Sequence, residues 1–179
     1  AFVHIRDTVK KLLELNRPGA EQIQLLSLNI PVEESIALLR GYARKEGVEL
    51  KLDLDPGLPE AGIAPAMIGQ VLMSLVSNAA EAMDDSDRDD SRRIWISTSS
   101  TDDWILLVVD DSGRGVPHEL RESIFDASYS TKHTAGVGVG LAVCRAVVQQ
   151  HNGEIDVEDS PRGGARFILR FPRTTETGS

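Results

Sequence analysis

The sequence has little of several features that mark other classes of protein. It contains one cysteine, so no disulfide can form within the chain, and this indicates a reducing compartment. Aromatic residues make up 4% of the chain, so aliphatic side chains must fill the core. No apolar run approaches the roughly 18 residues of a membrane-spanning helix, and the N-terminus lacks the apolar stretch of a signal peptide. We therefore expect a cytoplasmic region, which a longer, membrane-anchored protein would equally contain.

Positive charge is also in short supply. Lys and Arg total 19 against 28 Asp and Glu, which gives a net charge of −9. The phosphates of nucleic acids and the anionic surfaces of membranes attract clusters of Lys and Arg, so this acidity argues against both as partners. With 179 residues, 41% of them hydrophobic, the chain is long enough for one domain with its own core and a short extension.

The spacing of apolar residues predicts a mixture of helices and strands. Three- and four-residue spacings are typical of amphipathic helices, and alternation is typical of half-buried strands. We expect helices over 2–15, 30–47, 65–83, 117–125 and 139–150, and strands over 48–54, 94–99, 104–109, 154–158 and 165–171. The strands do not alternate evenly with helices, which disfavours a doubly wound parallel sheet. The predicted fold class is therefore α+β, a two-layer α/β sandwich in which helices back one face of a mixed sheet.

The predicted helix over 65–83 carries a polar stripe beside its apolar face. At about 100° per residue, Ser74, Asn78 and Ala82 share this stripe, and Glu81 lies next to it. The amide carbonyl of Asn78 could complete the oxygen shell of a magnesium ion that is held mainly by phosphates. The alternative is a hydrogen-bonded amide on the surface of a helix, and the spacing alone favours this plainer interpretation.

A second cluster, residues 110–115, follows the predicted strand over 104–109 and reads Asp-Asp-Ser-Gly-Arg-Gly. A carboxylate at the end of a strand can accept a hydrogen bond from the exocyclic amine of a base. Glycines beside it let the backbone lie flat against that base. Asp, Ser and Gly are equally common in β-turns, so this cluster alone is weak evidence for a nucleotide site.

Three alternate glycines in residues 136–140 lead into the last predicted helix. Backbone N–H groups at a helix N-terminus bind phosphate readily, and Lys132 could add charge there, with Ser130 and Thr131 as hydroxyl donors. The segment is not a P-loop, because no Gly-Lys-Ser/Thr follows the glycines. It is not the dinucleotide fingerprint either, because Leu141 occupies the position of the third glycine. The alternative is a flexible loop.

Four features therefore follow one another along the chain: an amide on a helix, an Asp-x-Gly-x-Gly turn, a glycine-rich segment entering a helix, and a glycine pair at 163–164 before the last strand. This ordered set resembles the ATP-binding catalytic domain of sensor histidine kinases, in the superfamily that includes gyrase, the Hsp90 chaperone and MutL. The resemblance covers about residues 31–172. Residues 124–132 look like the phenylalanine box of that family. The sequences at 78–83 and 130–132 look most like the subgroup of nitrogen- and oxygen-sensing kinases.

The resemblance implies how the chain is divided. It implies a Bergerat-type ATP-binding fold over residues 31–172. A partial helical hairpin, from a dimerisation and phosphotransfer region, would precede this fold together with a linker, over residues 1–30. Residues 173–179 would form a tail. By this division the catalytic unit accounts for most of the chain.

The resemblance also implies roles for individual residues. Asn78 would be the catalytic residue and the ligand of a magnesium ion that bridges the ATP phosphates. Asp111 would accept a hydrogen bond from the adenine amine, and residues 126–137 would form a mobile lid over the ATP. The implied ATP-binding residues are Asn78, Glu81, Ala82, Asp111, Gly113, Gly115, Val116, Ser130, Thr131, Lys132, Val137, Gly138, Val139, Gly140, Leu141 and Ala165.

Three departures from the family pattern bear on activity. Ser74 stands one turn before Asn78, where ATP-hydrolysing relatives have a glutamate, so hydrolysis would lack its general base. Transfer to an imidazole needs less help, because neutral histidine is already nucleophilic. Ala127 and Ser128 stand where the phenylalanine box has bulkier residues, which would loosen the lid. No phosphoacceptor histidine is evident, because His4 lacks the acidic residue and the proline of the acceptor motif.

The remaining histidines and the cysteine show no spacing typical of zinc ligands. We expect His118 on the surface, His133 in solvent within the lid, and His151 at the end of a helix. Cys144 is expected to be a small core residue. None of these four residues therefore indicates a metal site.

The function implied by the resemblance is that of an ATP-dependent protein-histidine kinase. The γ-phosphate of ATP would pass to a histidine on a helical hairpin, absent here, and then to an aspartate on a response-regulator receiver domain. ATP and Mg²⁺ are the implied cofactors, and we expect the full-length protein to be a homodimer. The alternative is a non-catalytic nucleotide-sensing module that docks partners. A gyrase-like ATPase is disfavoured, because it needs a glutamate near position 74 and a transducer domain.

Overall fold

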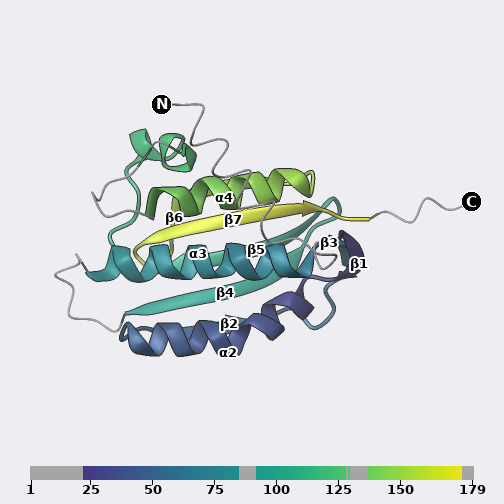
Figure 1. Ribbon diagram of the computed structural model, residues 1–179, viewed down its shortest axis with the longest axis horizontal. Helices are drawn as coiled ribbons and strands as arrows, with labels where there is room; N and C mark the ends of the chain where they lie inside the picture. The colour runs from purple at the N-terminus through teal and green to yellow at the C-terminus, as the bar shows by residue number, and fades with distance from the viewer. Residues whose placement is uncertain (1–21, 85–91, 128, 130–136, 175–179) are drawn as a thin grey trace, which may run out of the picture.

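The computed structural model describes residues 22–84, 92–127, 129 and 137–174. Seven strands and three long helices, with two short 3₁₀ helices, make up this part of the chain (Figure 1). In chain order they are β1 (Gln24–Ser27), α2 (Asn29–Lys45), β2 (Glu49–Asp53), β3 (Glu60–Ile63), α3 (Pro65–Asp84), β4 (Arg93–Ser100), β5 (Trp104–Asp111), η1 (His118–Leu120), η2 (Ser123–Phe125), α4 (Val137–Gln150), β6 (Glu154–Asp159) and β7 (Ala165–Pro172).

The main sheet has five strands in the order β2-β4-β5-β7-β6. β2 pairs with β4 in parallel, and the other three pairings are antiparallel. A separate two-stranded antiparallel sheet joins β1 to β3. The main sheet is therefore mixed, as the sequence predicts.

The three long helices lie over one face of the main sheet (Figure 1). Along β5, Ile105, Leu107 and Val109 are buried, whereas the residues between them are only half-buried. β7 alternates in the same way, and its Phe167 and Phe171 are among the largest fully buried side chains. This alternation places one face of the sheet in the core beneath the helices. The α+β class and the two-layer sandwich are confirmed.

Most of the predicted elements are present, with three differences. β1 and β3 were not predicted, because each has four residues and lies next to turn-forming residues. In place of one helix over 117–125 there are two 3₁₀ helices, η1 and η2. Helix α4 begins at Val137, two residues earlier than predicted, so the glycines at 138 and 140 belong to its first turn. The helix predicted over 2–15 lies outside the described residues.

Asn152, and not the glycine that follows it, is the left-handed residue at the end of helix α4. The positive φ of 55° belongs to Asn152. Gly153 is required for a different reason. A Cβ there would overlap the carbonyl oxygen of Arg170 and lie 3.0 Å from Cγ1 of Val148. The glycine therefore allows the chain to pass close to β7.

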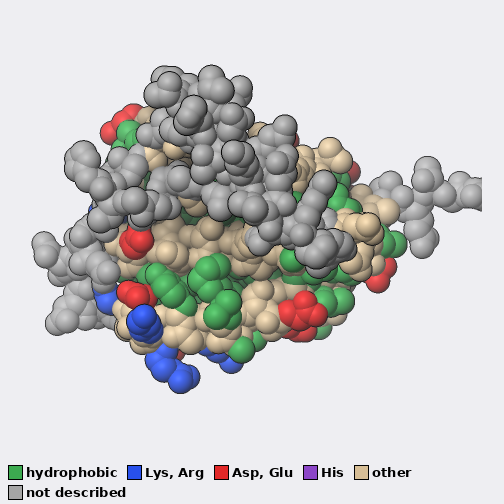
Figure 2. Space-filling model, in the orientation of Figure 1, with side chains coloured by type: hydrophobic (Ala, Val, Ile, Leu, Met, Phe, Trp, Pro, Cys, Tyr) green, Lys and Arg blue, Asp and Glu red, His purple; other side chains and the backbone are tan. Residues whose placement is uncertain are grey.

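The outer surface of the helical layer is partly apolar. Figure 2 shows hydrophobic side chains over α2 in the orientation of Figure 1, and Ile30 and Leu38 are the large hydrophobics of this helix that stay exposed. Within the described ranges, no helix combines the length and apolarity needed to cross a membrane. The buried apolar residues of α3 and α4 pack into the hydrophobic core.

His151 joins the end of α4 to the start of α3. Its Nε2 accepts a hydrogen bond from the backbone N–H of Ala64 (3.0 Å), and its Nδ1 lies 2.8 Å from the carbonyl oxygen of Val147. Since a carbonyl only accepts, Nδ1 carries the proton and the ring is neutral. Burial lowers the pKa of His151, against a smaller raising effect of the bond to Val147. The expected position at a helix end is confirmed, and the ring is also buried between elements.

We expect His151 to make the fold less stable in mild acid. Its pKa is lower in the folded state than the usual 6.5, so the unfolded chain binds the extra proton first. The stability from the neutral ring is full above about pH 6.5 and is lost as the pH falls towards the folded pKa. A His151→Leu variant should be less stable by about 1–3 kcal/mol at pH 8, because the Ala64 N–H loses its acceptor.

Urea unfolding between pH 8 and pH 5 tests this prediction. The difference in unfolding free energy between wild type and His151→Leu should narrow as the pH falls. His118→Ala, at an exposed position on η1, is the matched control and should follow wild type throughout. A difference that stays constant over this range contradicts the role of the neutral ring.

Candidate functional site: a cavity between two helices beside a buried carboxylate

Helix α3 has a core face and a polar face. Residues 71, 72, 75, 76, 79 and 80 are buried, whereas residues 73, 74, 77, 78, 81 and 82 are half-buried. Ser74, Ser77, Asn78 and Glu81 follow the i, i+3, i+4, i+7 spacing that places side chains on one side of a helix. The polar stripe that the sequence predicts is therefore present, and it includes one more residue, Ser77.

This polar face lines a cavity of about 290 Å³ between α3 and α4. Its hydrogen-bonding side chains are two serines, an amide and a carboxylate, all from α3. The hydroxyl of Tyr42, on α2, donates to Oγ of Ser77 over 3.4 Å and supports that wall. The lining residues are Met73, Ser74, Ser77, Asn78, Glu81, Gly140 and Leu141.

The first turn of α4 forms the other wall. Gly140 faces Ser74, and a Cβ at Gly140 would lie 3.6 Å from the Cβ of Ser74. The first N–H groups of a helix have no partner within the helix, and the first turn of α4 contains no acidic residue. This end of the helix therefore favours an anion.

A buried carboxylate, Asp111, ends strand β5 next to this cavity. Its Oδ1 accepts hydrogen bonds from the backbone N–H groups of Gly113 (2.8 Å) and Ala165 (3.2 Å). Burial raises the pKa of Asp111, the two backbone bonds lower it, and the charge of Asp110 adds a smaller raising effect. The carboxylate is thus held in one orientation in a place where its charge is poorly solvated.

Glycines are required around this carboxylate. A Cβ at Gly113 would lie 3.0 Å from Oδ1 of Asp111 and 3.2 Å from the carbonyl oxygen of Ala82 on α3. Gly115 has a φ of +75°, which side-chain-bearing residues rarely adopt. A Cβ at Gly164 would overlap Oδ1 of Asp111. The end of β5, the turn before β7 and helix α3 therefore meet without room for side chains.

The structure brings most of the described candidate residues into two adjoining groups. Ala82 follows Glu81 directly and lies one helical turn beyond Asn78, so the carboxylate group adjoins the last turn of the cavity wall. Val116 is half-buried and packs against the hydrophobic core. The cavity group contains Asn78, Glu81, Gly140 and Leu141, and the carboxylate group contains Ala82, Asp111, Gly113, Gly115 and Ala165.

Other candidates cannot be placed in either group. Ser130, Thr131 and Lys132 lie outside the described residues. Val137, Gly138 and Val139 are described as helical backbone only. The sequence analysis missed Met73 and Ser77 as lining residues, although the helical spacing of Ser77 from Ser74 and Glu81 was a signal that could have identified it.

Cys144 lies behind the cavity in the core. It is fully buried, and its thiol lies 3.8 Å from the carbonyl oxygen of Val71. Burial raises the pKa of Cys144 to about 12, so the thiol is protonated and unreactive. The predicted core position is confirmed.

Catalytic domains of histidine kinases are among the solved structures similar to this chain. The catalytic domain of histidine kinase ThkA, in a nucleotide-free form, matches 86% of this chain and 99% of its own with a TM-score of 0.72 and 28% identity. ThkA in complex with the response regulator protein TrrA matches 98% of this chain and 49% of its own, with a TM-score of 0.72 and 26% identity. The fold is that of an ATP-binding catalytic domain of the histidine kinase class.

The family comparison agrees with this class. The profile of the family "Histidine kinase-, DNA gyrase B-, and HSP90-like ATPase" matches residues 64–175, and the chain belongs to this family. The sensor protein FixL of Bradyrhizobium diazoefficiens is 33% identical over 168 residues, which are 94% of this chain and 33% of FixL. The kinase AtoS of Escherichia coli K12 is 32% identical over 94% of this chain and 27% of AtoS. The chain spans between about a quarter and a third of the length of these relatives.

Proposed function

We propose that this chain binds ATP in the cavity between α3 and α4 and transfers its γ-phosphate to a histidine, as the catalytic part of a sensor histidine kinase. The observation that supports the proposal is that the cavity group and the carboxylate group meet at α3. A cavity with polar side chains on its α3 wall and the start of α4 on its other wall adjoins a buried carboxylate that accepts from backbone N–H groups. A nucleotide needs both parts, one for its phosphates and one for its base.

Asp111 is the proposed acceptor for the adenine amine. Both of its backbone hydrogen bonds end on Oδ1, so Oδ2 is the oxygen that remains for a ligand. Gly113 and Gly115 place no side chain beside the Asp111 loop, which suits a flat base. Ala82, Val116 and Ala165 would complete the base pocket.

The phosphates would lie against the first turn of α4 and the polar face of α3. Gly138, Gly140 and the backbone from Val137 to Leu141 would bind them through N–H groups, with Ser130, Thr131 and Lys132 as further donors. The oxygen-bearing side chains on the α3 wall fit magnesium. Asn78 and Glu81 supply oxygen atoms, and the described residues contain no cluster of His, Cys, Asp and Glu able to hold a metal ion by itself, as suits an ion bound mainly by phosphates. Bound there, the ion would neutralise charge on the phosphates.

The reaction would be a displacement at the γ-phosphorus. A neutral imidazole nitrogen of the acceptor forms the new N–P bond, the bond from phosphorus to the bridging oxygen breaks, and ADP leaves with that electron pair. The cavity wall has Ser74 at the position where ATP-hydrolysing relatives carry a glutamate. A serine there does not activate water as a carboxylate does, which favours transfer to histidine over hydrolysis.

The proposal extends to partners that the chain does not contain. The acceptor histidine would be on a helical hairpin, to which residues 1–30 belong in part, and residues 31–172 and 173–179 would be the catalytic domain and tail. A receiver domain would take the phosphoryl group, as the complex of the related ThkA with a response regulator suggests. The full-length protein would be a homodimer, with this part in the cytoplasm, where ATP is available.

Incubation with labelled ATP, Mg²⁺ and a separately supplied acceptor hairpin of a histidine kinase tests the proposal. The expected result is an acid-labile label on the hairpin histidine together with one ADP for each label. Binding of ATP without label on any hairpin would support a nucleotide-sensing module instead. Absence of ATP binding in calorimetry, with and without magnesium, would overturn the proposal.

Asn78→Ala should separate binding from transfer. The variant is expected to bind ATP in the absence of magnesium nearly as wild type does, because the base contact is intact. Its magnesium-dependent transfer should fall by about tenfold or more, equivalent to at least about 1.4 kcal/mol in the barrier. Ser77→Ala, which removes a hydroxyl from the same wall, is the matched control, and its magnesium-dependent transfer should fall several times less. Equal losses in the two variants would contradict the role of the amide.

A further inference from the structure

Two consecutive aspartates end strand β5 and point to opposite faces of the main sheet. Asp111 lies on the side of α3, as the approach of Gly113 to both Asp111 and Ala82 shows. Asp110 lies on the side opposite the described helices, yet it is only 4% exposed. The proposed function uses Asp111 and gives no role to Asp110. A buried carboxylate on the open side of a sheet must have hydrogen-bonding or ionic partners that replace its lost hydration.

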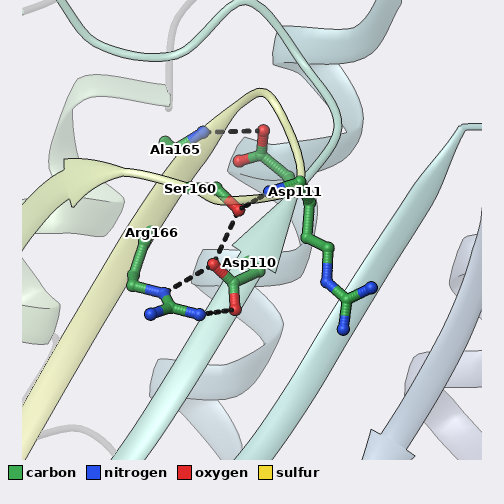
Figure 3. Close-up of polar contacts among 6 residues, drawn as sticks. Asp110, Asp111, Ser160, Ala165 and Arg166 are labelled. Carbon is green, nitrogen blue, oxygen red and sulfur yellow. Dashed lines mark hydrogen bonds and ion pairs between the residues drawn. The ribbon is translucent and has the colours of Figure 1, made fainter.

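Those partners are Arg166 and Ser160 (Figure 3). Nε of Arg166 donates to Oδ1 of Asp110 (2.8 Å) and Nη2 donates to Oδ2 (2.9 Å), which is a bidentate ion pair. The hydroxyl of Ser160 donates to Oδ1 over 2.7 Å. Asp110 and Arg166 are also direct cross-strand partners in the register of β5 and β7. The ion pair is thus built into the pairing of these strands.

The turn between β6 and β7, residues 160–164, folds over this ion pair. The backbone N–H of Arg162 donates to Oγ of Ser160 (3.0 Å). The guanidinium of Arg162 lies 4.7 Å from the ring centroid of Trp95, which pairs with Asp110 on the other side of β5. Asp110 is therefore covered by the turn and fixes it through Ser160.

The same turn holds Asp111 from the opposite side. Ala165, directly after the turn, donates its backbone N–H to Oδ1 of Asp111, as Figure 3 also shows. Gly164 lies so close that a Cβ would overlap that oxygen, and its own carbonyl accepts from the N–H of Ser160 over 2.8 Å. Any shift of the turn would consequently move the groups that orient the Asp111 carboxylate.

We propose that Asp110, Arg166 and Ser160 are positioning residues for Asp111. The ion pair and the hydroxyl on the outer face fix the β6–β7 turn, and the turn fixes the carboxylate that selects adenine. This inference rests on the proposed function, because it assumes that Asp111 contacts the base. If the ion pair between Asp110 and Arg166 is broken, the protein should discriminate less between bases but keep its contacts to the phosphates.

The test compares ATP with ITP, whose base has a carbonyl oxygen where adenine has the amine. Arg166→Met is expected to weaken ATP binding roughly tenfold and ITP binding less than twofold, because only ATP uses the orientation of Asp111. Arg166→Lys keeps the charge without the bidentate geometry and should lie between Arg166→Met and wild type. Ser160→Ala, a milder change, should reduce the preference for ATP two- to threefold and serves if Arg166→Met does not fold.

Arg170→Met is the matched control. Arg170 lies on the same strand and the same face as Arg166, it is exposed to a similar degree (27% against 31%), and it forms an ion pair with Asp156 on β6. Its ion pair has no contact with the turn, so both affinities should stay at wild-type values. Calorimetric titration of each folded variant measures the ratio of the two affinities.

The outcomes separate the two proposals. Wild-type protein that binds ATP and ITP equally would overturn the assignment of Asp111 to the base, and the positioning role with it. Wild-type protein that prefers ATP, together with variants at 166 and 160 that keep the full preference, would overturn the positioning role alone. If Arg170→Met lost the preference for ATP to the same degree, the positioning role would also be overturned, because the effect would then be general to ion pairs on this face.

Discussion

Replacement of Asp111 with asparagine is expected to weaken ATP binding on the order of 100-fold and to make the free protein more stable. Asparagine keeps an oxygen for the N–H groups of Gly113 and Ala165. At the position of Oδ2, however, it presents an amide donor to the adenine amine, which is also a donor. A lost hydrogen bond to a charged group costs about 1.5–3 kcal/mol, and two facing donors add a desolvation cost.

The gain in stability follows from the raised pKa. Burial raises the pKa of Asp111 above its usual value, so the folded state binds the proton more tightly than the unfolded chain. The stability from this group is full below the unfolded pKa and is lost as the pH rises through the folded pKa. At neutral pH the ionised carboxylate thus destabilises the fold, and a neutral amide of the same shape removes that penalty. The melting temperature should rise by a few degrees.

Calorimetric titration with ATP and a thermal melt at pH 7.5 together check both parts. Asp111→Ala is the informative companion variant, because it should lose ATP binding and also stability, since the N–H groups of Gly113 and Ala165 lose their acceptor. Tight ATP binding by either variant counts against the base assignment. A lower melting temperature for Asp111→Asn would show that the carboxylate charge does not destabilise the fold.

Elements with a strong repeating pattern could be predicted from the sequence. The core face of α3 follows from its apolar residues, and β4, β5, β6 and β7 follow from their alternation. β1 and β3 could not be predicted, because four-residue strands depend on each other for pairing rather than on a pattern of their own. The need for glycine at position 153 could not be predicted either, because the close approach of Arg170 on β7 arises only in the folded chain.

The layout of the candidate site could be predicted where its residues are close in sequence. Asn78 and Glu81 share a helix face, and Gly113 and Gly115 follow Asp111 within one turn, so local spacing places each set together, whereas their proposed roles come from the family resemblance. The role of Asp110 could not be predicted, because its partner Arg166 is 56 residues away and meets it only through the register of β5 and β7. Gly164 alone looks like a turn glycine, and its contact with Asp111 depends on the same register.

Gly164→Ala is therefore expected to damage the site from the turn between β6 and β7. A methyl group there would overlap Oδ1 of Asp111 and lie 2.5 Å from two backbone atoms, the carbonyl oxygen of Asp111 and the nitrogen of Gly113. Backbone atoms cannot rotate away as a side chain can, so the turn or the end of β5 must shift. We expect a loss of about 2–3 kcal/mol in the free energy of unfolding.

The same shift should reach ATP binding, because it moves the amide of Ala165 away from the carboxylate. A fall in affinity of roughly tenfold is expected, with ITP affected less. Gly41→Ala is the matched control, in the middle of α2, where a Cβ meets nothing within 4 Å. It should stabilise the fold by about 0.5–1 kcal/mol, since alanine favours a helix, and leave ATP binding unchanged. Urea unfolding and calorimetry on both variants decide the matter: a Gly164→Ala protein with wild-type stability and affinity would mean that the turn can adapt and does not hold Asp111 in place.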